Sequence, residues 1–463
     1  MPRLAPSIFR RAGRISPHLV TLLPSCRTIE SAQIELRWIR RHVLHSSRPR
    51  AEPHVNVLSP PNGEGRDRAR SHRVRARIGA RQRLSENSRL HATSRKDITE
   101  DLVARLVARR GAGEPLQYVL GTQPFGDLDI LCEKGVLIPR PETEAWASML
   151  GDLMLALFHH DSAEGKGERL RVLDLCSGTG CIGLSLYNHA MALARHRPPL
   201  RLFGFDVEAR AVRLARKNML HNFGGRHPLL PHHKGVPDVD VVESAITFRQ
   251  ADVFTDEWMQ YLDDAKAPRR GDGDEQDQSR RIDILVSNPP YISQRGFEVD
   301  TGRNVRNYEP KIALVPPGPS SLPPQAVDGT CAPEDIFYTR LLDIADVLRP
   351  RVAAFEVGDM RQAIRVVEMA IARTRPKHRL SGDQNSEKEG NEQMASRWDV
   401  LEIWRDWPYC QPSDTEDDVV RVCSREVPLR GSGHGRVVFL VEGQMLRNRF
   451  TNLGFRRQFY ADS

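Results

Sequence analysis

The feature that most constrains this sequence is a short apolar run, LRVLDL at residues 170–175, which leads directly into a turn containing two glycines. Comparable apolar runs follow it at 201–206, 246–250, 282–287 and 351–357, of which 246–250 is the weakest. Stretches with helical periodicity lie near 181–195, 208–221, 335–348 and 359–373. Strands that alternate with helices predict βαβ units and a parallel sheet, so the expected fold class is α/β.

Both ends of the chain depart from this alternation. Residues 399–406 and 436–442 are strand-like with no helical pattern between them, so we expect an antiparallel hairpin that closes the sheet. Near the start, residues 31–45 and 98–110 have the spacing of amphipathic helices and predict a small helical domain. The stretch 46–90 between these helices is rich in Pro, Gly, Ser and Arg, and we expect a disordered insert there.

Several classes of structure are disfavoured. No window approaches about 18 uncharged apolar residues, the length that predicts a membrane span. The seven cysteines are odd in number and show no C-x-x-C spacing, which predicts neither a disulfide framework nor a zinc site. His227, His232 and His233 lie among Pro, Gly and Lys, so we expect a loop and no metal. Three long polar or proline-rich stretches are expected to be insertions, at 262–281, 316–333 and 379–396.

The positive charge of the chain is concentrated at its start. Residues 1–95 contain 20 Arg, no Lys and 6 acidic residues, a local net charge of +14, which leaves −6 for residues 96–463 out of the total of +8. Residues 1–29 are rich in Arg and Ser and contain no acidic residue, a composition typical of an organellar transit peptide. The alternative is a disordered basic tail that carries no targeting signal. We predict a mitochondrial transit peptide, and therefore a location in the matrix.

The turn after the first strand reads DLCSGTG over residues 174–180, and a helical stretch follows it. Glycines let the backbone turn sharply and approach a ligand, because no Cβ stands in the way. Gly178, Gly180 and Gly183 also fit the dinucleotide fingerprint G-x-G-x-x-G. The turn alone therefore does not choose between NAD and S-adenosylmethionine.

Carboxylates at the strand ends favour S-adenosylmethionine. Asp174, just before the turn, can attract the cationic amino group of the methionine part, whereas it would repel a pyrophosphate. Asp206 ends the second strand and can accept hydrogen bonds from both ribose hydroxyls, although an NAD enzyme would place an acid similarly. Asp252 follows the third strand and can reach the adenine amino group. For Gly178, Gly180 and Asp206 the alternative is an ordinary turn or capping residue.

Asn288-Pro289-Pro290-Tyr291 follows the strand at 282–287, at the strand end where open α/β sheets bind ligands. The nitrogen of an amide or aromatic amine is a poor nucleophile because its lone pair is delocalised. The Asn288 side-chain oxygen and the Pro289 carbonyl can accept its N–H groups, while Tyr291 packs on the flat group. Positioning of this kind lowers a barrier by roughly 7 to 11 kcal/mol in favourable cases, and we assign no general base.

With these residues, the chain resembles the HemK-type release-factor glutamine methyltransferases. The Asn-Pro-Pro-Tyr motif is shared with adenine-N6 and guanine-N2 methyltransferases, whereas Ile138–Glu144 (IPRPETE) is far more specific to this family. Gly113–Tyr118, with Gly121, Phe125 and Gly126, is similar to its linker between domains. Three further segments are similar to the family pattern: Tyr308-Glu309-Pro310, Ala313-Leu314 and Glu356-Val357-Gly358.

The resemblance implies a Rossmann-like class I methyltransferase sheet of seven strands with an antiparallel last hairpin. It implies N5-methylation of the glutamine in the Gly-Gly-Gln motif of a peptide-chain release factor, with S-adenosylmethionine as methyl donor. The implied cofactor contacts are Cys176, Ser177, Gly178, Thr179, Gly180, Asp206, Val253 and Asn288. The implied glutamine contacts are Asn288, Pro289, Pro290 and Tyr291. Arg140, Glu142 and Glu144 are expected near the pocket mouth, with helix capping by Thr143 or Glu144 as the alternative.

The expected domains follow from these patterns. They are a transit peptide at 1–29, a helical domain at 30–112, a linker and hairpin at 113–145, the methyltransferase domain at 146–445 and a tail at 446–463. Two positions depart from the family pattern. Cys176 replaces the usual first glycine, so we expect its backbone to avoid positive φ, and Val253 replaces a frequent aromatic, which weakens adenine stacking.

Three other functions compete with this interpretation. A nucleic-acid methyltransferase would need an electropositive groove, yet residues 96–463 carry a net charge of −6. An NAD-dependent oxidoreductase is supported only by the glycine spacing. A catalytically silent interaction protein is opposed by the intact Asn288 and Tyr291. We therefore expect a release factor as the partner, and neither direct nucleic-acid binding nor membrane binding.

Overall fold

The computed structural model describes residues 4–46, 97, 99–162, 169–193, 200–224, 239–262, 282–318, 331–373 and 397–452. The chain divides into two compact units, Met1–Leu120 and Gly121–Ser463, whereas the sequence predicted boundaries at 112 and 145. The predicted inserts lie almost wholly outside the described residues, as does the histidine group at 227–233. Among the described helices, none is both long and apolar enough to cross a bilayer.

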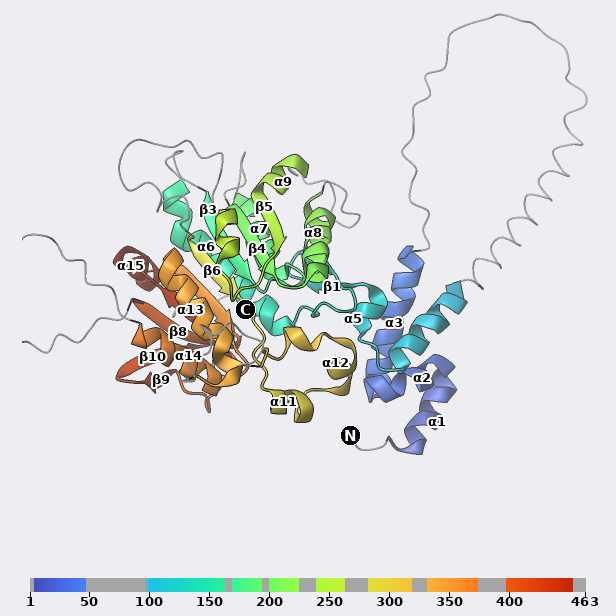
Figure 1. Ribbon diagram of the computed structural model, residues 1–463. Coiled ribbons are helices and arrows are strands. Elements are labelled where there is room, and N and C mark those ends of the chain that lie inside the picture. The colour runs from blue at the N-terminus through green and yellow to red at the C-terminus, as the bar shows by residue number, and fades with distance from the viewer. Residues whose placement is uncertain are drawn as a thin grey trace, which may run out of the picture. The chain divides into compact units, whose positions relative to one another are not determined.

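The first unit is helical (Figure 1). Its elements are α1 (Pro6–Ile15), α2 (Pro17–Cys26), α3 (Ile29–Ser46), a helix over 99–111 and α5 (Leu116–Leu120). The helices predicted at 31–45 and 98–110 are both present. They share an apolar core that includes Ile39, Val43 and Val103, and a two-bond ion pair between Arg110 and Glu35 links them at 2.6 and 3.0 Å.

The segment predicted as a transit peptide forms two helices of this unit. Each helix starts with a proline, which suits a first helical turn, and Ser16 caps α2 by accepting from the His18 amide. Leu19, Leu22 and Leu23 are at most 1% exposed within the shared core. Removal of residues 1–29 would therefore expose apolar surface on α3. The mitochondrial address itself stays a prediction.

The second unit contains a nine-stranded sheet in the order β5-β4-β3-β6-β7-β11-β8-β10-β9. Its strands are β3 (Leu170–Leu175), β4 (Leu200–Asp206), β5 (Ile246–Gln250), β6 (Ile284–Ser287), β7 (Val352–Glu356), β8 (Val400–Trp407), β9 (Val419–Val422), β10 (Arg425–Arg430) and β11 (Ser432–Val441). The first five run parallel, and β11 lies antiparallel between β7 and β8. The predicted closing hairpin is therefore confirmed. The sheet exceeds the predicted seven strands by β9 and β10, which extend its edge beyond β8.

Helices cover both faces of this sheet, which explains why the strand sequences are almost continuously apolar (Figure 1). In β6, Ile284 and Val286 face the core formed with α6, α7 and α8, whereas Leu285 faces the core formed with α13 and α14. The longer helices are α6 (Pro141–Ser162), α7 (Cys181–Leu193), α8 (Ala209–Phe223), α13 (Ile336–Leu348) and α14 (Met360–Ala372). The shorter ones are α9 (Val239–Ala245), α11 (Gln294–Val299), α12 (Arg303–Tyr308) and the 3-10 turns Glu257–Leu262, Lys311–Ala313 and Pro333–Asp335.

Two peripheral elements complete the unit. The hairpin β1 (Thr122–Phe125) and β2 (Leu128–Leu131) is antiparallel and packs on the same core as α8. Helix α15 (Gln444–Asn452) lies where a tail was predicted, and it buries Leu446 and Phe450 against that core. The folded body therefore extends past the predicted boundary at residue 445.

The strand order reverses between β3 and β6, and this reversal positions the site. The chain proceeds from β3 through β4 to β5 on one side, and from β6 to β7 on the other. The loops after β3 and β6 therefore diverge and leave room for a ligand between them. Ser287 lies opposite Leu175 in the register and donates a hydrogen bond from its hydroxyl to the Leu175 carbonyl at 2.7 Å.

Candidate active site

The loop between β3 and α7 is a tight turn that needs its glycines. The Ser177 amide donates to the Phe205 carbonyl at 3.0 Å, and the Gly180 amide donates back to the Ser177 carbonyl at 2.7 Å. Gly178 has φ +54° and Gly180 has φ +79°. A Cβ on Gly180 would lie 2.8 Å from the Phe248 ring, so both conformation and space require glycine there.

Cys176 adopts φ +60°, so the expectation that its backbone avoids positive φ is wrong. The left-handed conformation costs a non-glycine residue roughly 1 to 2 kcal/mol. The turn imposes it, because Cys176 connects a buried strand end to a loop whose Ser177 and Gly178 amides donate to the Phe205 carbonyl and the Asp206 carboxylate. Burial raises the pKa of the Cys176 thiol, which therefore stays protonated.

Asp174 is fully buried, and only one of its two carboxylate oxygens accepts a hydrogen bond from a described residue. Its Oδ2 accepts from the Gly183 amide at 3.1 Å, whereas Oδ1 has no hydrogen-bond partner among the described residues. Burial raises the pKa of Asp174 to about 7, and the nearby Asp206 adds to this, although the Gly183 amide opposes it. The Ser177 hydroxyl is also buried, and no described residue bonds to it. An unpaired carboxylate oxygen beside this loop fits the amino group of S-adenosylmethionine.

Asp206 closes the same loop from the end of β4. Its Oδ2 accepts from the Gly178 amide at 2.8 Å and its Oδ1 from the Glu208 amide at 2.9 Å. Burial raises its pKa, and the two amides act against that shift. Each oxygen keeps a lone pair, so a ribose contact is compatible with these bonds.

Asp252 and Val253 lie just beyond the end of β5. The exposed Asp252 accepts from the Phe254 amide at 2.9 Å, a hydrogen bond within its own turn. The Val253 side chain packs into the core, while its carbonyl accepts from Arg340 at 2.8 Å. An adenine could therefore contact the main chain of this segment and the Asp252 side chain, but not the Val253 side chain.

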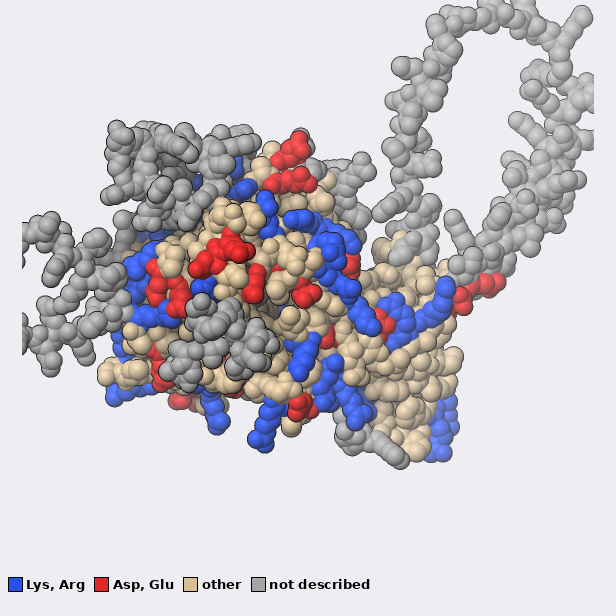
Figure 2. Space-filling model, viewed as in Figure 1, with Lys and Arg blue, Asp and Glu red and all other residues tan. Residues whose placement is uncertain are grey.

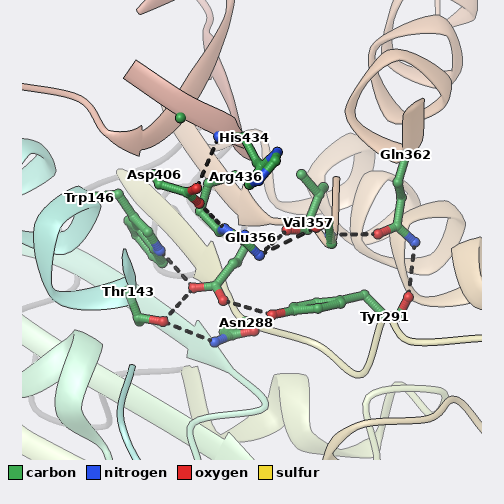
Figure 3. Close-up of polar contacts among 12 residues, drawn as sticks. Thr143, Trp146, Asn288, Tyr291, Glu356, Val357, Gln362, Asp406, His434 and Arg436 are labelled. Atoms are coloured by element: carbon green, nitrogen blue, oxygen red, sulfur yellow. Dashed lines mark hydrogen bonds and ion pairs between the residues drawn. The ribbon is translucent and has the colours of Figure 1, made fainter. Parts of the chain in front are cut away.

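Asn288 and Tyr291 both point to groups that the sequence did not assign to the site (Figure 3). The Asn288 Nδ2 donates to the Thr143 hydroxyl at 3.5 Å, and the Tyr291 hydroxyl donates to Glu356 Oε1 at 3.1 Å. Gln362 on α14 supports the loop by donating to the Tyr291 carbonyl at 3.3 Å. The motif after β6 is thus fastened to α6, β7 and α14.

Glu356 is the group at this site that the sequence reasoning quoted but gave no role. It ends β7, is 1% exposed, and accepts hydrogen bonds from Thr143, Trp146 and Tyr291 at 2.7, 2.7 and 3.1 Å. Burial raises its pKa, and those donors together with Arg436 work in the opposite direction. The sequence offered one indication of this role, since Glu356 is an acidic residue at the end of an otherwise apolar strand.

A pocket of about 250 Å³ opens beside Asn288 and Tyr291. Its lining residues are Leu137, Arg140, Asn288, Tyr291, Ile292, Thr301, Val305, Ala313 and Leu314. Arg140 reaches this pocket as expected, but its guanidinium is paired with the buried Glu309 at 2.7 Å. Glu144 accepts from the Gly126 amide at 2.9 Å. A larger pocket of about 410 Å³ between α13 and α14 is lined by none of the predicted site residues.

The raised pKa of Asp174 predicts a pH-dependent cofactor affinity. Below pH 7 this carboxyl is protonated in the free protein, so binding of a cationic amino group must release a proton. We expect the Kd for S-adenosylmethionine to rise as the pH falls from 7.5 to 5.5, by up to about tenfold per pH unit. Titration calorimetry measures it. In Asp174→Asn binding should be weaker and nearly independent of pH; identical profiles for both proteins would contradict the assignment.

The positive φ of Cys176 predicts an unusual order of stabilities. Cys176→Gly should melt at or above the temperature of the wild type, because glycine adopts this conformation without strain. Cys176→Val should be destabilised by roughly 1 to 3 kcal/mol, since a β-branched residue tolerates positive φ poorly. Thermal melting followed by circular dichroism compares them. Cys410→Val, at an exposed position without positive φ, is the control, and equal losses at both sites would refute the argument.

Several known proteins are similar in sequence to this chain. No family model matches the chain. The chain is 29% identical over 315 residues to "Mitochondrial MRF1 N(5)-glutamine methyltransferase MTQ1" of Saccharomyces cerevisiae, covering 68% of each chain. It is 33% identical over 211 residues to the probable mtq1 protein of Schizosaccharomyces pombe, covering 44% of this chain and 53% of that one. It is 26% identical over 268 residues to a "Release factor glutamine methyltransferase" of Bacteroides thetaiotaomicron, covering 57% and 71%.

Solved structures match more weakly. The catalytic domain of human METTL16 bound to an RNA hairpin is 14% identical, with a TM-score of 0.33 and coverage of 73% and 81%. Because this TM-score is low, the fold is assigned from the strand order of the sheet and not from superposition on that structure. The chain is therefore an S-adenosylmethionine-dependent methyltransferase with a Rossmann-like α/β sheet, and it is similar in sequence to the release factor glutamine methyltransferases.

Proposed function

We propose that this protein transfers a methyl group from S-adenosylmethionine to the side-chain nitrogen, N5, of the glutamine in the Gly-Gly-Gln motif of a mitochondrial peptide-chain release factor. The observation that carries the proposal is the placement of Asn288 and Tyr291 on the wall of a pocket after β6, the strand whose last residue pairs with the last residue of β3. The printed names of the yeast and bacterial relatives support the same substrate.

The pocket has the chemistry of a site for an uncharged polar group. Leu137, Ile292 and Leu314 supply apolar walls, and Asn288 supplies a neutral amide. The cation of Arg140 is already paired with Glu309. A neutral carboxamide fits these surroundings better than a charged side chain, because burial of an unpaired charge is costly.

The proposed reaction depends on positioning by this chain. The bound cofactor supplies an electrophilic methyl group on a sulfonium. Asn288 Oδ1 and the Pro289 carbonyl accept the two N–H groups of the glutamine amide, and Tyr291 packs on the amide plane. Transfer would form the new N–C bond as the S–C bond breaks, with the neutral thioether of the spent cofactor as the leaving group and the proton of the nitrogen passing to water. Cofactor contacts are proposed for Asp174, Cys176 to Gly180, Asp206, Asp252, Val253 and Asn288.

A nucleic-acid methyltransferase with the same motif remains the second candidate, because a flat base can occupy an Asn-Pro-Pro-Tyr site. On the face shown in Figure 2, however, the Lys and Arg side chains are mixed with Asp and Glu. This mixture lacks the basic stripe that binds a phosphate backbone. We therefore favour a protein substrate for this pocket.

The proposal predicts a mapped methylation. Purified protein with labelled S-adenosylmethionine should methylate a recombinant mitochondrial release factor, and mass spectrometry should place the methyl group on the glutamine of Gly-Gly-Gln. Asn288→Ala should lower kcat/KM roughly 100-fold or more, since it removes an acceptor at the reacting nitrogen. Asn188→Ala, a half-buried position on α7 away from the pocket, is the matched control and should behave as the wild type.

Two results would overturn this assignment. Transfer to RNA or DNA without transfer to the release factor would promote the second candidate. Transfer to the release factor at another residue would leave the enzyme class intact and reject the glutamine.

We further propose that the protein resides in the mitochondrial matrix, on the basis of the basic start of the chain and the yeast relative. A C-terminally tagged protein in isolated mitochondria should resist external protease until the inner membrane is lysed. Degradation after rupture of the outer membrane alone would exclude the matrix. The mature N-terminus, read by mass spectrometry, would show whether α1 and α2 remain on the protein.

A further inference from the structure

A chain of hydrogen bonds leads from the end of β7 to the amide of Asn288 (Figure 3). The Thr143 hydroxyl lies 2.7 Å from Glu356 Oε2, and the Asn288 Nδ2 lies 3.5 Å from the same hydroxyl oxygen. Glu356 and Thr143 are both buried, at 1% and 2% exposure. The chain therefore connects a reacting-site amide to a carboxylate that is shielded from water.

The direction of the hydrogen bonds at Glu356 is set by its partners. The Trp146 indole nitrogen can only donate, and it donates to Oε2 at 2.7 Å. The Tyr291 hydroxyl donates to Oε1 at 3.1 Å, and burial raises its pKa, so it keeps its proton. Arg436, which is ion-paired with Asp406 at 2.7 Å, adds a favourable positive potential. These partners all suit an ionised carboxylate, which can only accept.

Because Glu356 only accepts hydrogen bonds, the donor and acceptor roles of Thr143 and Asn288 are also fixed. A threonine hydroxyl has one proton, and an acceptor-only carboxylate takes it. The hydroxyl oxygen keeps lone pairs, so it can only accept from the next group along the chain. The NH₂ group of Asn288 must therefore face Thr143, which leaves the Asn288 carbonyl oxygen to face the pocket.

This order of donors matters because an asparagine amide has two orientations that differ by a half-turn about the last side-chain bond. One presents an acceptor to a substrate N–H, and the other presents a second donor, which would repel it. Sterically the two are nearly the same, so only hydrogen-bond partners distinguish them.

We propose that Glu356 and Thr143 are positioning residues that hold the Asn288 amide with its oxygen toward the pocket. This inference rests on the proposed function only for the identity of the substrate. Glu356 touches no reacting atom; it acts through Thr143, and through the Tyr291 hydroxyl on the other side of the motif.

The kinetic test uses three variants of the full chain. Glu356→Gln can donate as well as accept, so it permits the reversed order, and Thr143→Val removes the relay hydroxyl at nearly constant volume. Both should lower kcat about 10- to 100-fold, as expected for a misplaced reacting group, with the Kd for S-adenosylmethionine changed less than about threefold. Thr143→Ser restores the hydroxyl and should recover most of the activity.

Tyr338→Phe is the matched control. It removes a buried hydrogen bond of 2.7 Å to the backbone carbonyl of the same residue, Glu356, but leaves the side-chain relay intact. Its melting temperature should fall comparably to that of Glu356→Gln, while its kcat stays near that of the wild type. An equal loss of kcat in Tyr338→Phe would show a general structural effect and would overturn the proposal.

A second measurement does not depend on the substrate. The side-chain NH₂ signals of Asn288 can be identified in ¹⁵N-labelled protein by their absence in Asn288→Asp. We expect these signals to shift in Thr143→Val and Glu356→Gln and to return in Thr143→Ser. Unchanged signals together with unchanged kcat in Thr143→Val would refute the relay. If the wild type fails to methylate a release factor, the proposed substrate is wrong, and the NMR result still decides the orientation of Asn288.

Discussion

The catalytic unit depends on one buried carboxylate. Glu356 accepts hydrogen bonds from two side chains of α6, Thr143 and Trp146, and from Tyr291 after β6, so three segments far apart in the sequence meet at one side chain. Removal of one hydrogen-bond partner from a buried polar group of this kind typically costs roughly 1 to 3 kcal/mol, because the group is left unsatisfied. The same group thus contributes to the fold and to the geometry of the Asn-Pro-Pro-Tyr motif.

The parallel sheet brings the site together. Asp174, Asp206, Asn288 and Glu356 lie at or just after the carboxyl ends of β3, β4, β6 and β7, which are neighbours in the strand order. Parallel strands put all these ends on one edge, and the reversal of strand order at β3 separates the loops enough for a ligand. The Ser287 hydroxyl then ties the end of β6 to the end of β3, next to the loops that follow the two strands.

Predictions from local sequence were least accurate where the backbone conformation, or a residue far away in the sequence, determines the structure. Cys176 has a side chain that disfavours positive φ, yet the loop forces φ +60° because its neighbours are tied to β4. Arg140 was placed correctly at the pocket, but its pairing with Glu309, 169 positions away, lay beyond any local pattern. The edge strands β9 and β10 were missed because their short, charged sequences carry no clear alternation.

The sequence by itself determined the α/β class, the five parallel strands, the closing hairpin and the motifs that we propose for cofactor and substrate binding. These features are local, since hydrophobic periodicity and glycine-dependent turns are properties of adjacent residues. Only the tertiary structure decided that Glu356 joins the site, that Thr143 donates to it, and that one oxygen of Asp174 has no partner among the described residues. Such facts depend on which strand ends become neighbours and on how completely water is excluded between them, and no window of sequence contains that information.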